Sequence, residues 1–175
     1  KSIDNYKKIL DLNPDKTYSN RAKFNISWNQ LAEFNFDEGF KNYEIRNDKP
    51  LIKKQINEII NLFSCKEWDG ENLNDKTILI LSEQGLGDNI QFFRYLFWIK
   101  DEFNTNVIFY VNKKKSHLFE NSPFKIVSNL SNVKHIDYFA FIMSLPGIYY
   151  KQNQTFQKLI QYIKPNKENE LKWKN

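Results

Sequence analysis

Two short apolar runs on either side of one helical pattern constrain the fold of this chain more than any other feature. The runs are TILIL at residues 77–81 and NVIFYV at residues 106–111, both rich in β-branched and aromatic residues, as is typical of strands buried on both faces. Between them, residues 89–100 have the pattern of a helix. A strand, a helix and a strand in this order predict a βαβ unit with parallel strands and a right-handed crossover.

Weaker patterns follow in the C-terminal part of the chain. Residues 124–127, 133–136 and 138–145 (FKIV, VKHI and YFAFIMSL) resemble short strands. Helical spacing predicts a short helix at residues 117–121 and a last amphipathic helix at residues 155–163. This succession predicts an α/β fold with an open, mostly parallel sheet.

The N-terminal part, residues 1–64, is predicted to be helical. Apolar side chains recur there at helical spacing, and residues 51–63 form the last amphipathic helix of the series. A polar connector at residues 67–76, rich in Asn and Asp, follows it. We place the domain boundary at this connector, with a helical region of residues 1–66 and an α/β region of residues 67–175.

Composition restricts the compartment and the class of protein. One cysteine in 175 residues excludes a disulfide framework and is typical of a reducing compartment. No apolar run reaches the roughly 18 residues that cross a bilayer, and no signal-peptide pattern opens the chain. We therefore predict a cytoplasmic protein without a transmembrane segment. The chain starts at Lys1 rather than at Met, so we expect it to be a fragment of a longer protein.

The net charge of +5 allows an anionic partner, but the basic residues are scattered along the chain. Lys113, Lys114 and Lys115 form the one tight cluster, which we interpret as a solvated turn, because no nucleic-acid-binding motif accompanies it. The two histidines, His117 and His135, lie on different predicted elements without metal-ligand spacing. The sequence therefore predicts neither nucleic-acid binding nor a metal site.

The loop after the first strand, SEQGLGDN at residues 82–89, carries two of the chain's five glycines. A dinucleotide-binding fingerprint needs a third glycine where Ile90 stands and an acid at the end of the second strand, which instead runs into Lys113. Asp88 would also oppose a pyrophosphate at the helix N-terminus, and the lysine and hydroxyl of a P-loop are absent. Nucleotide binding at this loop is therefore disfavoured, and no cofactor is predicted.

Two interpretations of Asp88 remain open at this point. Aspartate is among the best N-caps, so one interpretation is that it only caps the following helix. The other is that its carboxylate takes a proton from an acceptor hydroxyl during group transfer.

The helix at residues 89–100 is apolar around nearly its whole circumference, so it needs cover on more than one side. We expect this cover from the sheet and from either the N-terminal helices or a second lobe. Arg94 lies in this apolar setting and needs an anionic or carbonyl partner. The partner could be Glu83, in a salt bridge, or the phosphate of a substrate.

Parts of the N-terminal region resemble each other at an offset of 37 residues, as in Tyr6 against Tyr43. Residues 2–14 resemble the second helix of a tetratricopeptide repeat, and residues 22–46 resemble a full repeat in which Gly39 takes the small position. The resemblance implies a protein or peptide partner at the repeats. An ordinary helical hairpin is the alternative.

Residues 68–96, WDGENLNDKTILILSEQGLGDNIQFFRYL, resemble the start of a glycosyltransferase-like domain that follows tetratricopeptide repeats in many bacterial proteins. DEGFKNYEIR at residues 37–46 and SLP at residues 144–146 fit the same family in the same order. The domain is similar to the N-terminal half of heptosyltransferases, glycosyltransferase family nine. This similarity implies a Rossmann-like lobe of a two-domain GT-B fold.

The same resemblance implies a role for the glycine loop. In that family a Gly-Asp turn after the first strand faces the acceptor sugar, and its aspartate is the proposed general base. Carried over to this chain, the base is Asp88, in a turn formed by Gly85, Leu86 and Gly87. The other substrate-binding positions are then Gln84, Asn89, Gln91, Arg94, Ser144 and Pro146.

A sugar or glycan acceptor and a nucleotide-sugar donor are the partners that the resemblance implies. The donor would be bound mainly by a C-terminal lobe beyond Asn175, so we expect this chain alone to have little or no transferase activity. The competing hypothesis is a non-catalytic binding module, in which the repeats recruit a protein or peptide and the α/β part is a degenerate scaffold.

Overall fold

A computed structural model of the chain describes residues 2–83, 85–158 and 162–163. The chain divides into two compact units, Lys1–Leu62 and Phe63–Asn175. The division falls before the expected boundary at residue 66, because Lys66 and Glu67 already form β1, a strand of the sheet.

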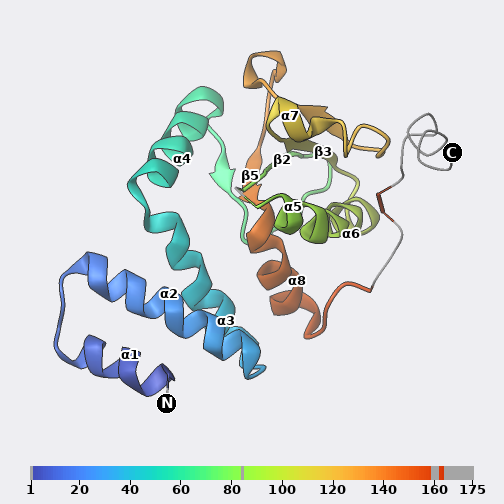
Figure 1. The fold of residues 1–175 in the computed structure, drawn as a ribbon. Helices are drawn as coiled ribbons and strands as arrows, with labels where there is room; N and C mark the ends of the chain where they lie inside the picture. The colour runs from blue at the N-terminus through green and yellow to red at the C-terminus, as the bar shows by residue number, and fades with distance from the viewer. Residues whose placement is uncertain (1, 84, 159–161, 164–175) are drawn as a thin grey trace, which may run out of the picture. The chain divides into compact units, whose positions relative to one another are not determined.

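Consecutive helices build the first unit (Figure 1). Asp15 begins the second of them, because its carboxylate accepts hydrogen bonds from the backbone N–H groups of Thr17 (2.8 Å) and Tyr18 (3.2 Å). This helix, α2, packs against both α1 and α3, which gives helix–turn–helix pairs. The elements are α1 (Ser2–Asp11), α2 (Lys16–Ala32), α3 (Phe36–Tyr43), the 3₁₀ helix η1 (Glu44–Asp48) and α4 (Pro50–Phe63).

The contact between α2 and α3 depends on a glycine and on aromatic rings. A Cβ atom at Gly39 would lie 2.8 Å from Leu31 Cδ2, so a larger residue would push the two helices apart. Phe24 of α2 stacks on Tyr43 of α3, with ring centroids 5.6 Å apart. The guanidinium of the buried Arg46 lies 4.5 Å from the centre of the Tyr43 ring.

The second unit contains a parallel sheet (Figure 1). Within the described residues its strand order is β1-β5-β2-β3-β4, and every pairing is parallel. The predicted α/β fold with an open, parallel, Rossmann-like sheet is therefore confirmed. The strands are β1 (Lys66–Glu67), β2 (Thr77–Leu81), β3 (Asn106–Tyr110), β4 (Lys125–Val127) and β5 (Tyr138–Phe141).

The central strand is buried on both faces, as its unbroken apolar run predicted. Ile78 and Ile80 point to the face that carries the main core, while Leu79 and Leu81 alternate to the other face, and none of the four has exposed surface. Helices cover the first of these faces: α5 (Leu86–Phe92), α6 (Arg94–Glu102) and α8 (Leu145–Asn153) (Figure 1).

The predicted helix at residues 89–100 is two helices, α5 and α6, joined at Phe93. The Phe93 ring has no exposed surface and packs on Phe109 of β3 and on Phe119 and Phe124, with centroids 4.6 to 5.5 Å away. Tertiary packing of this one side chain therefore coincides with the break between the two helices.

The cover over α6 comes in large part from its own unit. The Trp98 ring contacts Tyr149 of α8 at 4.9 Å and Trp68 at 5.7 Å. On another side of the helix, Phe97 packs edge-on against Phe124 at 4.8 Å. The expectation of cover from the N-terminal helices or a second lobe overlooked α8 and the segment that carries Phe124.

Two of the weaker predictions between β3 and β5 are wrong. The short helix lies at α7 (Lys113–Ser116) rather than at residues 117–121, because the Asn112 side chain caps it by accepting a hydrogen bond from the Lys114 N–H (2.9 Å). The lysine cluster is accordingly helical and not a plain turn. Residues 133–136 form an irregular connection rather than a strand.

The end of the described chain also differs from its prediction. β5 stops at Phe141, and the rest of the predicted strand forms the 3₁₀ helix η3 (Ile142–Ser144) and the start of α8, where Pro146 occupies the first turn. α8 ends at Gln154, which adopts a left-handed conformation (φ 51°). In the helix predicted at residues 155–163, the described residues are not helical, and residues 159–161 lie outside the described part.

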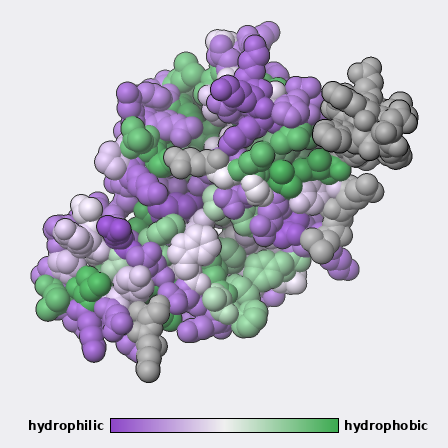
Figure 2. Space-filling model, viewed as in Figure 1, coloured by the Kyte–Doolittle hydropathy of each residue, from purple (hydrophilic) through white to green (hydrophobic). Residues whose placement is uncertain are grey.

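Hydrophilic side chains cover most of the face shown in Figure 2, with smaller apolar areas between them. In the described part of the chain, no helix is both long enough and apolar enough to cross a membrane.

Asp137 ties the start of β5 to the start of β2 and supplies a test of the fold. Its carboxylate accepts from the Thr77 N–H (2.8 Å), and its own N–H donates to the Thr77 carbonyl (2.9 Å). We expect Asp137→Ala to lower the free energy of unfolding by about 1–3 kcal/mol in urea titrations, because the Thr77 N–H loses its acceptor. Asp137→Asn, which keeps an acceptor oxygen, should cost less.

The Asp137 carboxylate should also make the free energy of unfolding depend on pH in the acidic range. The Thr77 N–H, followed by His135 and Lys76, holds the pKa of Asp137 below its usual value. Its contribution is therefore complete above the unfolded-state pKa of about 4 and is lost as the pH falls through the lower folded-state pKa. Urea titrations between pH 7 and pH 2 should show a smaller loss of stability in Asp137→Asn than in the wild type, and equal losses would contradict this role.

Candidate functional site

The order of the strands creates a switch point beside β2. From β2 the chain proceeds to β3 and β4 on one side, whereas β5 lies on the other side of β2. The connections that leave the carboxyl ends of β2 and β5 lead to α5 and α8, which cover the same face of the sheet. Open α/β sheets bind ligands beyond the carboxyl ends of the strands where the strand order reverses, which here is between β2 and β5. The turn after β2 that contains Gly85 and Gly87, hereafter the glycine turn, lies at the carboxyl edge of the sheet. Residues 142–144, which follow β5, lie at the same edge.

The buried side chain of Asn89 shapes the turn between β2 and α5. Its Nδ2 donates to the backbone carbonyls of Glu83 (2.8 Å) and Gly85 (2.7 Å), and its Oδ1 accepts from the Glu83 N–H (3.1 Å). Asn89 has no exposed surface. The side chain predicted to bind substrate thus holds the turn in place from inside.

Glu83 links the two connections across the switch point. Its Oε2 accepts a hydrogen bond from the backbone N–H of Met143, in η3, at 3.0 Å. Among the interactions of the described residues, none joins Glu83 to Arg94, so the expected salt bridge between them is not formed. Sequence reasoning missed this role of Glu83, whose only local signal is an acid two residues beyond a buried strand.

Asp88 lies in the first turn of α5 but does not cap the helix, because the N-cap residue is Gly85. The half-buried carboxylate folds back over Gly85, so that a Cβ atom at position 85 would clash with Asp88 Oδ2. A negative charge in the first turn is favourable next to the positive end of the helix dipole. Gly85 has ordinary dihedral angles (φ −70°, ψ 124°), so its small size rather than its flexibility makes room for the carboxylate.

Gly87 borders open space at the start of the same helix. A Cβ atom built there would meet no other atom within 4 Å, and both Gly87 and Leu86 are exposed. A ligand can therefore approach the backbone next to Asp88 without displacing any described side chain.

Arg94 follows the turn at the start of α6. Its Nε is buried and has no hydrogen-bond acceptor among the described residues, and its guanidinium lies 5.4 Å from the centre of the Tyr95 ring. Burial raises the pKa of the Tyr95 hydroxyl, and the Arg94 charge partly opposes that rise. Arg94 thus holds a positive charge in a partly apolar setting with one N–H group to spare.

The remaining predicted positions differ in exposure. Ser144 is the N-cap residue of α8 and Pro146 is in its first turn, and both are buried after β5 at the same edge of the sheet. The Gln91 side chain is exposed, and the backbone carbonyl of this residue accepts from the Tyr162 hydroxyl at 3.5 Å. Gln84 lies outside the described residues. The structure thus brings Gly85, Gly87 and Asp88 together at the surface, with Asn89 beneath them.

Within the described part of the chain, no group of three or more His, Cys, Asp or Glu side chains is placed to hold a metal ion. Comparisons of the chain with protein-family models, with curated proteins and with solved structures found no match.

The two glycines of the turn provide a matched pair of variants. We expect Gly85→Ala to lower the free energy of unfolding by about 1 kcal/mol, because alanine is a poor N-cap and its methyl group displaces the Asp88 carboxylate. Gly87→Ala should leave stability unchanged or raise it by about 0.5 kcal/mol, because alanine favours the helix and its methyl group enters open space. Urea unfolding of both variants checks the pair, and an equal loss at both positions would contradict the described turn.

Proposed function

We propose that the carboxyl edge of the sheet at the β2–α5 turn binds the sugar or glycan acceptor of a glycosyl transfer, with Asp88 as the general base. The observation that carries this proposal is the half-buried Asp88 carboxylate beside the open backbone of Gly87, at the switch point of a Rossmann-like sheet. The resemblance of residues 68–96 to heptosyltransferases supports the same assignment.

The proposed transfer needs few protein side chains at the acceptor site. Asp88 takes the proton of the acceptor hydroxyl. At the same time the acceptor oxygen forms a bond to the anomeric carbon of the donor sugar, and the bond from that carbon to the nucleoside diphosphate breaks. Asn89 and Gly85 act as positioning residues, because they set the place of the carboxylate without facing the acceptor. Arg94, whose side chain is half-buried, is proposed to contact a substrate phosphate through the exposed part of its guanidinium.

The nucleotide-sugar is proposed to bind a second lobe, as in the two-domain family that the sequence resembles. The glycine turn itself lacks the third glycine of a dinucleotide site and carries a carboxylate at the helix N-terminus. This turn therefore suits a neutral hydroxyl better than a diphosphate.

A second candidate function, recruitment of a protein or peptide by the first unit, is favoured by one observation. Trp28 of α2 is 52% exposed although its ring contacts Phe24 at 6.0 Å and Tyr43 at 5.4 Å. Exposed aromatic side chains held in place by their neighbours are frequent at protein-binding surfaces. In this case the α/β unit would serve as a scaffold.

Asp88→Asn in the full-length protein separates these functions. We expect transfer from a panel of nucleotide-sugars to saccharide acceptors to lose about 100-fold or more in kcat, because the amide cannot accept the proton. Asp101→Asn, which removes an exposed carboxylate from the other end of the helix pair, is the matched control and should retain activity.

Urea unfolding of both variants establishes that each is folded. Undiminished transfer by a folded Asp88→Asn variant would contradict the role of Asp88. The absence of transfer by the wild type across the panel would instead favour the scaffold.

A further inference from the structure

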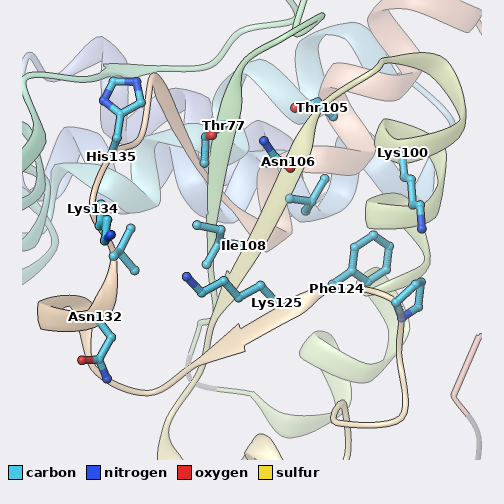
Figure 3. A pocket seen from close by; sticks show the side chains of 13 residues that line it. Thr77, Lys100, Thr105, Asn106, Ile108, Phe124, Lys125, Asn132, Lys134 and His135 are labelled. Carbon is cyan, nitrogen blue, oxygen red and sulfur yellow. The ribbon is translucent and has the colours of Figure 1, made fainter.

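A hollow of about 580 Å³ lies at the amino edge of the sheet, at the opposite ends of the strands from the glycine turn. Thr77 and Asn106, the first residues of β2 and β3, line it together with Lys125, the first residue of β4 (Figure 3). Its volume is within the range of about 300–1,000 Å³ that is usual for sites of small ligands.

The hollow results from a difference in strand length. β4 begins at Lys125, which pairs with Ile108 of β3. Asn106 and Val107, the first two residues of β3, therefore extend beyond the amino end of β4. The irregular connection that carries Val133, Lys134 and His135 lines another side of the space. Lys100 and Phe124 lie on one side of these strands in Figure 3, and Lys134 and His135 lie on the other.

Basic side chains line the hollow without acidic ones. Lys100, Lys125, Lys134 and His135 are among its lining residues, which include no Asp or Glu. Among the ion pairs of the described residues, none involves Lys100, Lys125 or Lys134. Three exposed lysines of the lining thus have no carboxylate partner among the described residues, although Asp137 contacts the lining residues Thr77 and His135.

Two other lysines of this unit, Lys76 and Lys151, are paired with carboxylates. Lys76 lies 3.8 Å from Asp137, and Lys151 lies 2.7 Å from Asp69. The Asp137 carboxylate also lies 3.3 Å from His135 Nε2. The positive potential of the hollow therefore comes mainly from the lysines.

The wall of the hollow combines donors with apolar surface. Asn106 and Asn132 carry amide N–H groups, whereas Val107, Ile108, Phe124 and Val133 supply apolar contact. The Lys100 Nζ lies 5.9 Å from the centre of the Phe124 ring, which holds this ammonium at the rim. The lining is therefore mostly polar, with an apolar part, and suits a charged ligand better than an apolar one.

We propose that this hollow, hereafter the lysine pocket, binds a small anion that carries two or more phosphate or carboxylate groups. Three separated ammonium groups match a multivalent anion better than a single charge, since each can donate to a different oxygen. The bound anion would bridge the start of β4 and the connection before β5. This inference is independent of any transfer at the glycine turn, because the pocket lies at the other edge of the sheet.

Isothermal titration calorimetry at low salt tests the proposal on the full chain, with tripolyphosphate and citrate as probes. We expect the wild type to bind at least one of them with a sub-millimolar Kd, and the tighter probe identifies phosphate or carboxylate as the preferred group. In Lys125→Gln/Lys134→Gln the affinity should fall at least about tenfold, because two charged hydrogen bonds are lost.

Lys113→Gln/Lys114→Gln is the matched control, since it removes the same charge from α7, which follows the carboxyl end of β3. It should change the affinity by less than about twofold, because exposed charges at that separation are screened. Absence of binding by both probes would overturn the proposal, and so would an equal loss of affinity in the two double variants. Urea unfolding of each variant excludes a loss of fold as the cause.

Discussion

The buried amide of Asn89 is the interaction on which the carboxyl edge of the sheet depends. Its three hydrogen bonds satisfy backbone groups of Glu83 and Gly85 in the turn that follows the fully buried residues 78–81 of β2. Unpaired polar groups at this depth would each cost about 1–3 kcal/mol, so the turn has little freedom to rearrange. With its backbone fixed in this way, Glu83 can reach Met143 and connect β2 to the element after β5.

The same constraint explains the position of Asp88. Because Asn89 fixes where α5 begins, Gly85 becomes the N-cap and the carboxylate one turn later folds over it. The carboxyl edge of the sheet therefore presents an anion beside open space at Gly87, whereas the amino edge presents the lysine pocket. The two sites proposed on this sheet thus differ in charge, and we expect their ligands to differ accordingly: a hydroxyl at the first and an oxyanion at the second.

Local patterns in the sequence predicted the central sheet well, because burial of β2 and β3 requires continuous apolar runs such as residues 77–81. They failed where distant contacts decide the structure. Packing of Phe93 against Phe109, Phe119 and Phe124 accompanies a break in a helix that appears continuous in the sequence. Similarly, the partner of Glu83 lies 60 residues away, and the lysine pocket depends on the relative lengths of two strands. Contacts between residues far apart in the chain leave no periodic pattern in the sequence from which they could be predicted.

Mapping where a saccharide binds tests the proposed acceptor site most directly. Backbone amide NMR spectra of the labelled protein, titrated with a panel of hexoses, heptoses and their disaccharides, would locate the contact. We predict shifts concentrated at Gly85, Gly87 and Met143, on the two connections that Glu83 joins. Shifts confined to other parts of the molecule, or none with any member of the panel, would contradict the assignment of this edge as an acceptor site.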